Sequence, residues 1–358
     1  MPTPHPALTT DLFPYGVASG DLTSDSVVLW TKVATPGSAV SWWCEPARVD
    51  GPSGGRRLSG TAMADPATGS VHVLVDGIGG ERQYRYGFAA GGAASPEGLF
   101  KTLPIDRPAR FAVVCCAKFN SGFFNAYRAL AEMDDIDFVL HLGDYVYEAA
   151  EVPVGKQTPG ANIGRPMDPL GTCVTYADYD TRYREYRGDQ DLLLLHSRHA
   201  MIATVDDHEL SDNAWEGGAD EHDPARDGSW DDRKKAAMDA WQDWMPTMRH
   251  PLSVDGHRGT DHVWQEISLG DAGRILLCET RLARSDPAAA DGPDKTELGT
   301  AQRDWLMSAL EAPVPGWTFL AMPSMLASVE GAASDPDALF ALRKLKLTDA
   351  DEIGRAHV

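Results

Sequence analysis

The chain has 358 residues, enough to bury one large core and to add a smaller module. Hydrophobic residues make up 43% of it, and no run approaches the roughly 20 apolar residues that are needed to span a bilayer. The 53 Asp and Glu residues outnumber the 32 Lys and Arg residues, and the net charge of -21 repels polyanions. This composition argues against a membrane span and against general nucleic-acid binding, and a phosphate-bearing ligand would need local cations such as metal ions.

The cysteines and the N-terminus limit the class of protein further. The five cysteines are Cys44, Cys115, Cys116, Cys173 and Cys278. Because their number is odd and no C-x-x-C pair occurs, we expect neither a disulfide framework nor a structural zinc site. The first 16 residues, MPTPHPALTTDLFPYG, contain no charged segment followed by an apolar one, so the sequence shows no export signal.

The first third of the chain is rich in short β-type runs. Turn residues separate the runs SVVLWTKV, AVSWWCE, SVHVLV, RQYRYGFA and GLFKT between residues 26 and 102. Runs of this length and spacing predict a small antiparallel β-sandwich. Two prolines in Thr102–Arg110 then precede a new apolar run. We therefore expect an N-terminal β domain over residues 1–104 and a second domain over residues 105–352.

From Phe111 onward, short apolar runs alternate with helical patterns, as in a layered α/β architecture. The patterns predict helices over residues 124–133, 176–187, 231–244 and 300–310. In the last of these, one apolar stripe at a period of 3.6 residues predicts packing on a sheet. The stripe consists of Ala301, Trp305, Leu306 and Leu310.

Five apolar runs of the second domain end in polar residues. FAVVC precedes Cys116, FVLHL precedes Gly143-Asp144-Tyr145, MIATV precedes Asp206-Asp207-His208-Glu209, RILLC precedes Glu279-Thr280-Arg281, and WTFLAM precedes Pro323-Ser324. In α/β sheets, ligands bind beyond the carboxyl ends of the strands, so we expect these segments to converge on one site.

The residue types at these strand ends are those of a metal site. Carboxylates suit hard cations, imidazole suits several transition metals, and a thiolate or phenolate stabilises oxidised iron. Metal ions would also be needed if such a site hydrolysed a phosphate ester. Hydrolysis of an unactivated phosphate ester can require an acceleration of about 10²¹-fold, whereas one general acid or base supplies about 10²–10⁴-fold, so metal ions must supply much of the remainder. Taken singly, each piece has a structural alternative. Gly143-Asp144 could be a turn, Asp207-His208 a helix cap, and Cys115 and Cys116 buried core thiols.

Several ordered motifs resemble one known family over most of the chain. The motifs are FPYGVASGDLTSDSVVLWTKV from Phe13, FAVVCCAKFN from Phe111, HLGDYVYE from His141, DDHELSDN from Asp206 and LGTAQRDWL from Leu298. They resemble the PhoD-like alkaline phosphatase/phosphodiesterase family of the metallophosphoesterase superfamily. The resemblance implies an α+β layered fold, in which an N-terminal Ig- or fibronectin-like β-sandwich is followed by a metallophosphatase-type β-sandwich flanked by helices.

The resemblance also implies a ferric iron site supported by calcium. Cys116, Asp144 and Tyr147 would be the iron ligands, and Asp144 would also bridge to a second metal. Asp207 and Asn213 would be the next metal ligands. The substrates would be small phosphate esters, hydrolysed by a metal-activated hydroxide, with the preference between mono- and diesters left open.

His208 follows Asp207, where related metallophosphoesterases use a histidine to steer the phosphate and protonate the leaving group, so we expect it to be catalytic. Two positions depart from the family pattern. Cys115 stands where Ser is usual, which leaves two adjacent thiols. Cys116 is taken as the ligand by its position in the motif, and the two thiols point to opposite sides if the strand continues. CETR at Cys278–Arg281 stands where D-T-R is usual, and we expect Arg281 to form a structural ion pair with that carboxylate or to bind phosphate.

The family continues beyond this length to a strand that ends in a GD-x-H motif, which does not occur here. The last six residues, IGRAHV, are what a common sequencing adapter encodes when it is read in frame. We therefore expect residues 353–358 to be a non-native tail, and the catalytic domain to be truncated and inactive as written. The family is typically exported, so the resemblance implies a periplasmic or extracellular enzyme, although the chain shows no twin-arginine signal.

Two other functions fit parts of the sequence. A purple-acid-phosphatase-like or nuclease metallohydrolase would also use the tyrosine of GDYVYE, but Cys116 and DDHE in place of N-H-E favour the PhoD-like family. In a non-catalytic alternative, the β-rich module binds carbohydrate or another surface beside a degenerate remnant, with Trp30, Trp42 and Trp43 as a stacking platform. Alternation along a strand places Trp42 and Trp43 on opposite faces, which weakens this hypothesis.

Overall fold

A computed structural model describes residues 7–47, 56–80, 82–150, 160–248, 263–290 and 292–324. The expected tail over residues 353–358 and the last part of the expected second domain lie outside the described residues. Within the described ranges, no helix is both long and apolar enough to cross a bilayer. The elements form three sheets with helices on two sides, which confirms the prediction of a layered fold of helices and sheets with a β-rich N-terminal part.

One sheet, called the central sheet, runs through both expected domains. Its strands are, in order, β5 (Ser70–Asp76), β2 (Ser26–Lys32), β1 (Val17–Gly20), β11 (Met201–Ala203), β10 (Phe138–His141) and β9 (Phe111–Val114). β2 runs antiparallel to both β1 and β5, whereas β1 lies parallel to β11 with Gly20 opposite Met201. A Cβ atom on Gly20 would lie 2.4 Å from the Pro246 carbonyl oxygen and 2.5 Å from the Met201 carbonyl oxygen. The junction between the two parts of the sheet therefore requires glycine.

A second sheet covers the N-terminal half of the central sheet. It contains β4 (Leu58–Met63), β3 (Ala39–Pro46), β6 (Gln83–Ala90) and β7 (Ala93–Ala94), and β8 (Gly98–Lys101) pairs with β6. Val27 and Leu29 of β2 share one buried hydrophobic cluster with Tyr86 and Phe88 of β6. The five runs that predict strands in this region all form strands, and β1, β4 and the two-residue β7 are additional strands that those runs do not include.

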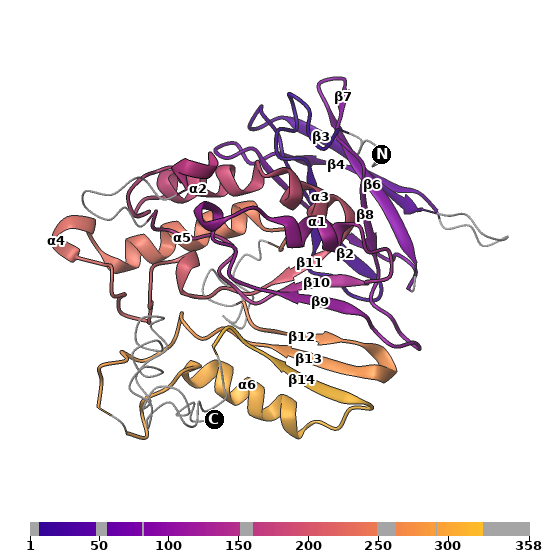
Figure 1. Cartoon of the computed structure of the whole chain (residues 1–358). Helices are drawn as coiled ribbons and strands as arrows, with labels where there is room; N and C mark the ends of the chain where they lie inside the picture. The colour runs from indigo at the N-terminus through magenta and orange to yellow at the C-terminus, as the bar shows by residue number, and fades with distance from the viewer. Residues whose placement is uncertain are drawn as a thin grey trace.

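A third sheet lies against the C-terminal half of the central sheet, next to β9 and β10 in Figure 1. It contains β12 (Gln265–Ser268), β13 (Gly273–Leu277) and β14 (Trp317–Ala321). Leu140 of β10 and Ile202 of β11 share a buried cluster with Ile275 of β13. Because side chains alternate along a strand, Val139 and Met201 belong instead to the cluster on the opposite face, under the helices.

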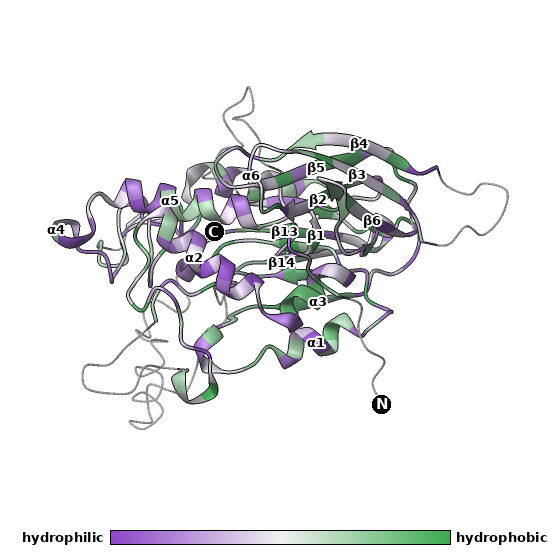
Figure 2. Cartoon of the chain, turned by 90° about the horizontal axis from the view of Figure 1, so that it is seen from above, coloured by the Kyte–Doolittle hydropathy of each residue, from purple (hydrophilic) through white to green (hydrophobic). Residues whose placement is uncertain are grey.

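Helices cover the two outer faces of these layers (Figure 1). α1 (Asn125–Ala131), α2 (Tyr176–Arg187), α3 (Gln190–Arg198) and α5 (Trp230–Trp244) lie over the central sheet, and α6 (Gly299–Glu311) lies on the third sheet. The shorter helices are α4 (Pro224–Asp227), η1 (Phe119–Ser121), η2 (Ala161–Ile163), η3 (Asp207–Glu209) and η4 (Gly270–Ala272). All four predicted helices are present, and α3 and the one-turn α4 are additional α-helices. In Figure 2, α5 carries both hydrophilic and hydrophobic colours, as expected of a helix with one face on a core.

One buried arginine of α2 fixes a loop that carries a predicted metal ligand. The guanidinium of Arg182 donates hydrogen bonds to the carbonyl oxygens of Asp168, at 3.1 Å, and of Pro169, at 2.6 Å. It also donates to the carbonyl oxygen of Tyr147. The packing of α2 on the central sheet thereby sets the position of the Tyr147 backbone.

The apolar stripe predicted for α6 is partly wrong. Leu306 is buried, but Leu310 is 46% exposed and Ala301 is exposed as well. The helix turns Gln302 inward instead, where its Oε1 accepts from the Glu279 amide at 2.9 Å and its Nε2 donates to the Glu279 carbonyl oxygen at 2.9 Å. A polar side chain can occupy this core position because the end of β13 satisfies both of its hydrogen-bonding groups.

Candidate metal centre

The candidate site lies beyond the carboxyl ends of β9, β10 and β11, three adjacent parallel strands of the central sheet. The chain turns sharply where these strands end, with a φ of 60° at Cys116, 95° at Gly143 and 55° at Asp144. Asn213, in the loop after η3, has a φ of 56°. Left-handed backbone is uncommon at residues other than glycine, and such strain is concentrated at functional sites. Among the described residues, four residues other than glycine have a positive φ, and three of them, Cys116, Asp144 and Asn213, are predicted metal ligands.

Five of the six predicted side chains gather around one carboxylate. One oxygen each of Asp144 and Asp207 and one ring nitrogen of His208 all lie within 4.8 Å of one another. The Tyr147 hydroxyl donates to Asp144 Oδ2 at 3.0 Å, and Cys116 Sγ lies 3.5 Å from the same oxygen. The cluster thus combines oxygen, nitrogen and sulfur donors.

The two carboxylates of the cluster have opposite pKa shifts. Burial raises the pKa of Asp144, and the charges of Asp206 and Asp207 act in the same direction, so that it reaches about 7 although the charge of His208 opposes the shift. Burial also acts to raise the pKa of Asp207, but the positive charges of Arg281 and His208 outweigh it and hold that pKa below its ordinary value. The negative charge at Asp144 is therefore incompletely compensated, and together with the donor set it fits a bound metal ion.

Tyr147 and Cys116 are protonated donors to Asp144 in this structure. Burial raises the pKa of both groups well above their ordinary values, and the negative charge of Asp144 adds to that shift. A metal ion at this position would favour the phenolate and thiolate forms, because ligand groups lose their protons when a metal binds.

Asn213 joins the cluster through its backbone. Its amide donates to Asp207 Oδ2 at 2.6 Å, and its side-chain nitrogen donates to Asp220 Oδ2 at 2.8 Å. The side-chain oxygen of Asn213 is the atom that could bind a cation, because an amide nitrogen cannot.

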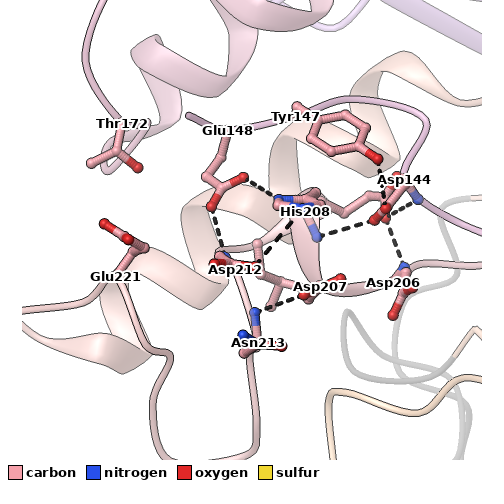
Figure 3. Close-up of polar contacts among 12 residues, drawn as sticks. Asp144, Tyr147, Glu148, Thr172, Asp206, Asp207, His208, Asp212, Asn213 and Glu221 are labelled. Carbon is pink, nitrogen blue, oxygen red and sulfur yellow. Dashed lines mark hydrogen bonds and ion pairs between the residues drawn. The ribbon is translucent and has the colours of Figure 1, made fainter. Parts of the chain in front are cut away.

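The imidazole of His208 is held on two sides, between Glu148 and Asp144 in Figure 3. Its Nδ1 lies 2.8 Å from Glu148 Oε2, and its ring lies on that of Tyr147 with centroids 4.1 Å apart and an interplanar angle of 30°. Burial acts to lower the pKa of His208, but the hydrogen bond and the charge of Glu148 raise it to about 10. The side chain is only 16% exposed, so His208 is not a solvated histidine, although Asp206 does cap the short helix η3.

Comparison with known proteins assigns this chain to a family. A family model of the PhoD-like phosphatase matches residues 111–351, and a model of the PhoD-like phosphatase N-terminal domain matches residues 2–104. The chain belongs to the PhoD-like phosphatase family. The resemblance drawn from the motifs is therefore confirmed.

Two relatives of this PhoD-like chain support the assignment. The chain is 31% identical over 335 residues to alkaline phosphatase D of Bacillus subtilis (strain 168), over 86% of this chain and 55% of the relative. A solved structure of PhoD matches it with a TM-score of 0.73 at 29% identity, over 88% of this chain and 63% of that chain. The chain spans about half the length of the curated relative that it matches.

Two buried carboxylates of the PhoD-like chain belong to the site although sequence reasoning does not single them out. Glu148 and Glu209 are both fully buried. Glu148 binds His208 and also accepts the Asp212 amide at 2.7 Å, and Glu209 accepts three backbone amides of the site loops. The signal that could have found them is their position inside HLGDYVYE and DDHELSDN, next to predicted site residues.

The partner expected for Arg281 is wrong. Arg281 Nε lies 2.5 Å from Asp206 Oδ1 and its Nη2 lies 3.6 Å from Asp207 Oδ1, so the side chain reaches the loop after β11. The Glu279 carboxylate accepts backbone amides instead, those of Arg281 at 2.8 Å and Leu282 at 2.7 Å. Because Glu279 is occupied by its own loop, the guanidinium remains available to the carboxylates of the site.

Contrary to expectation, the described residue Ser324 after β14 contacts the loop after β13 and not the metal cluster. The Ser324 hydroxyl lies 2.7 Å from Thr280 Oγ1 and donates to Glu297 Oε1 at 3.4 Å, so it joins the loop after β13. Cys115 and Cys116 are both exposed residues, although the Cys116 thiol is half-buried against Asp144, so the alternative of two buried core thiols is wrong.

The tryptophans do not form the stacking platform of the non-catalytic hypothesis. Trp30 is fully buried and donates from Nε1 to the Asp243 carbonyl oxygen at 2.9 Å. The guanidinium of Arg57 lies 4.3 Å from the centre of the Trp43 ring and covers it. The three indoles therefore share no exposed face.

Proposed function

We propose that this chain carries the active site of a metal-dependent phosphoric ester hydrolase of the alkaline phosphatase/phosphodiesterase type. The observation that carries this proposal is the gathering of Asp144, Asp207 and His208 within 4.8 Å at adjacent strand ends. Membership of the PhoD-like phosphatase family supports the same reaction class. The substrates are small phosphate esters, attracted by bound cations because the net charge of -21 does not attract them.

The proposed metals are ferric iron and calcium. Cys116, Asp144 and Tyr147 hold the iron, because thiolate and phenolate stabilise its oxidised state. Asp207 and Asn213 would hold calcium through oxygen atoms, and Asp144 would serve both metals. The metals, when bound, supply positive charge for the phosphate oxygens and acidify a water molecule for attack. The protein itself supplies the metal ligands in fixed positions. Arg182 and Arg281 help to fix them, because they hold the neighbouring loops in place.

We assign His208 the role of general acid. Glu148 pairs with Nδ1, whereas Nε2 lies 3.9 Å from Asp212 Oδ1, beyond hydrogen-bond distance, so Nε2 is the nitrogen that can meet a substrate. From Nε2 a protonated His208 can steer a phosphate oxygen and pass its proton to the leaving alkoxide. His208→Ala should then lower turnover by about 10²–10⁴-fold while iron and calcium contents stay intact. Loss of metal in this variant would make His208 a ligand instead.

The proposal also covers the organisation of the chain. Residues 1–104 form an Ig- or fibronectin-like module, and residues 105–352 form the catalytic module with its metallophosphatase-type sandwich. The second sheet, which packs on β1, β2 and β5, supports the first assignment, and the third sheet, which packs on β9 and β10, supports the second.

The test is hydrolysis of p-nitrophenyl phosphate and bis-p-nitrophenyl phosphate by the full-length protein, with and without added ferric iron and calcium. We expect metal-dependent hydrolysis that is lost in Asp144→Asn and kept in Asp137→Asn. Asp137 serves as the control because it is also buried and accepts a backbone amide, from Arg110 at 2.9 Å, beside an ion pair with Arg107 at 2.7 Å. It precedes β10, at the end of the strand away from the site. Metal-independent hydrolysis, or no hydrolysis with both metals bound, would overturn the proposal. Two transition-metal ions per chain would favour the purple-acid-phosphatase-like alternative.

A further inference from the structure

Glu209 joins two loops that carry different metal ligands. Its Oε2 accepts the Asp144 amide at 2.9 Å and the Asp206 amide at 2.7 Å, and its Oε1 accepts the Tyr145 amide at 2.5 Å. Asp144 and Tyr145 follow β10, whereas Asp206 follows β11. A single carboxylate therefore receives three backbone donors from the ends of two neighbouring strands.

The same two loops meet closely at one further point. Gly143 has a φ of 95°, and a Cβ atom added to it would lie 2.5 Å from the Asp206 backbone nitrogen and 2.6 Å from the Asp206 Cβ. The loops are thus in van der Waals contact with no space for another side chain between Gly143 and Asp206. Glu209 supplies the polar part of this contact and Gly143 the steric part.

We propose that Glu209 is a positioning residue, which fixes the loop of Asp144 relative to the loop of Asp207 and so sets the spacing of the metal ligands. This inference rests on the proposed function, because it assigns Glu209 to the same metal site. Glu209 itself is not a metal ligand: it is fully buried, and its two oxygens point to backbone amides. Partners that orient metal ligands from behind typically change metal affinity by about 10–100-fold when they are replaced.

Two substitutions test whether the three hydrogen bonds from backbone amides to Glu209 matter, and not merely the presence of a buried carboxyl group. Glu209→Gln keeps the length of the side chain but turns an amide nitrogen, which cannot accept, toward at least one backbone N–H. Glu209→Asp keeps the carboxyl group and both oxygens but shortens the side chain by one methylene, so it cannot reach both loops. Asp137→Asn is again the control, since it neutralises a buried carboxylate at the other end of β10.

The first measurement is amide hydrogen exchange of the full chain without added metal, read by mass spectrometry. In both Glu209 variants we expect exchange at Asp144, Tyr145 and Asp206 to quicken by at least about tenfold, while β10 and β11 stay protected. Unchanged exchange at these amides would overturn the proposed contact whatever the metals do.

The second measurement is calorimetric titration of the same proteins with calcium chloride, together with iron content after incubation with ferric citrate. We expect calcium affinity to fall by about 10–100-fold in both Glu209 variants and to stay unchanged in Asp137→Asn. Faster exchange with unchanged metal affinity would overturn the positioning role, and so would wild-type affinity in Glu209→Asp. If the wild-type chain binds neither metal while the variants still exchange faster, the proposed function fails but the contact between the loops holds.

Discussion

Acid should destabilise this protein through His141, the last residue of β10. His141 is fully buried, and its Nε2 lies 3.0 Å from the Tyr127 hydroxyl. Its Nδ1 has no hydrogen-bond partner in the described part of the chain, so a proton there would be buried without an acceptor. Burial accordingly lowers the pKa of His141 to about 3.

The size and sign of the effect follow from linkage. The unfolded chain takes up a proton at this residue near its ordinary pKa of about 6.5, whereas the folded chain does so only near pH 3. The contribution of neutral His141 to the unfolding free energy is therefore fully present above pH 6.5 and is lost as the pH falls toward 3. From about pH 6.5 down to pH 4, at about 1.36 kcal/mol per pH unit, the loss amounts to about 3 kcal/mol.

The assay is urea unfolding of the wild type, His141→Gln and Tyr127→Phe at pH 7, 5.5 and 4. The wild type should lose about 3 kcal/mol more of its unfolding free energy between pH 7 and pH 4 than His141→Gln does, because only the wild type has this titration. Tyr127→Phe should keep the pH dependence of the wild type, since burial raises the pKa of Tyr127 well above this range. Equal pH dependence in the wild type and His141→Gln would refute the reasoning.

Three further predictions concern the site. In Glu148→Gln an amide nitrogen can face His208 Nδ1, so turnover should fall by about 10²–10⁴-fold with metal content unchanged, as steady-state kinetics and metal analysis would show. Arg281→Met removes the cation beside Asp206 and should lower the unfolding free energy by about 3–5 kcal/mol in urea titrations, and a loss under 1 kcal/mol would contradict this. Gly143→Ala meets the Asp206 backbone at 2.5 Å and adopts positive φ, so it should cost about 1–3 kcal/mol by the same assay.

The positions of the strands and of the central ligands could be predicted from the sequence because both depend on local pattern. Asp144 and Asp207 each follow an apolar run, and a strand end fixes where the next side chain lies. α3 could not be predicted in the same way, because Leu192–Leu195 is a continuous apolar run without helical periodicity. The structure explains this pattern, since the helix is buried on all sides from Asp191 to Ser197.

The remaining features depend on contacts that a sequence does not display. The partners of Glu209 are backbone amides, which every residue except proline carries, so no residue type marks them. Arg281 could reach several carboxylates, and only the turn that occupies Glu279 decides between them. The pairing of β1 with β11 joins residues that are far apart along the chain.

That pairing has a consequence for how the protein is made. Gly20 faces Met201, so about 180 further residues must leave the ribosome before β1 can meet its neighbour in the sheet. At about 5–20 residues per second, this takes about 10–40 s. During that time the nascent N-terminal module presents an unpaired inner strand, the kind of edge that aggregates or recruits a chaperone. The match to the N-terminal domain of the family ends at residue 104, yet the sheet that begins in that domain is completed only by β11.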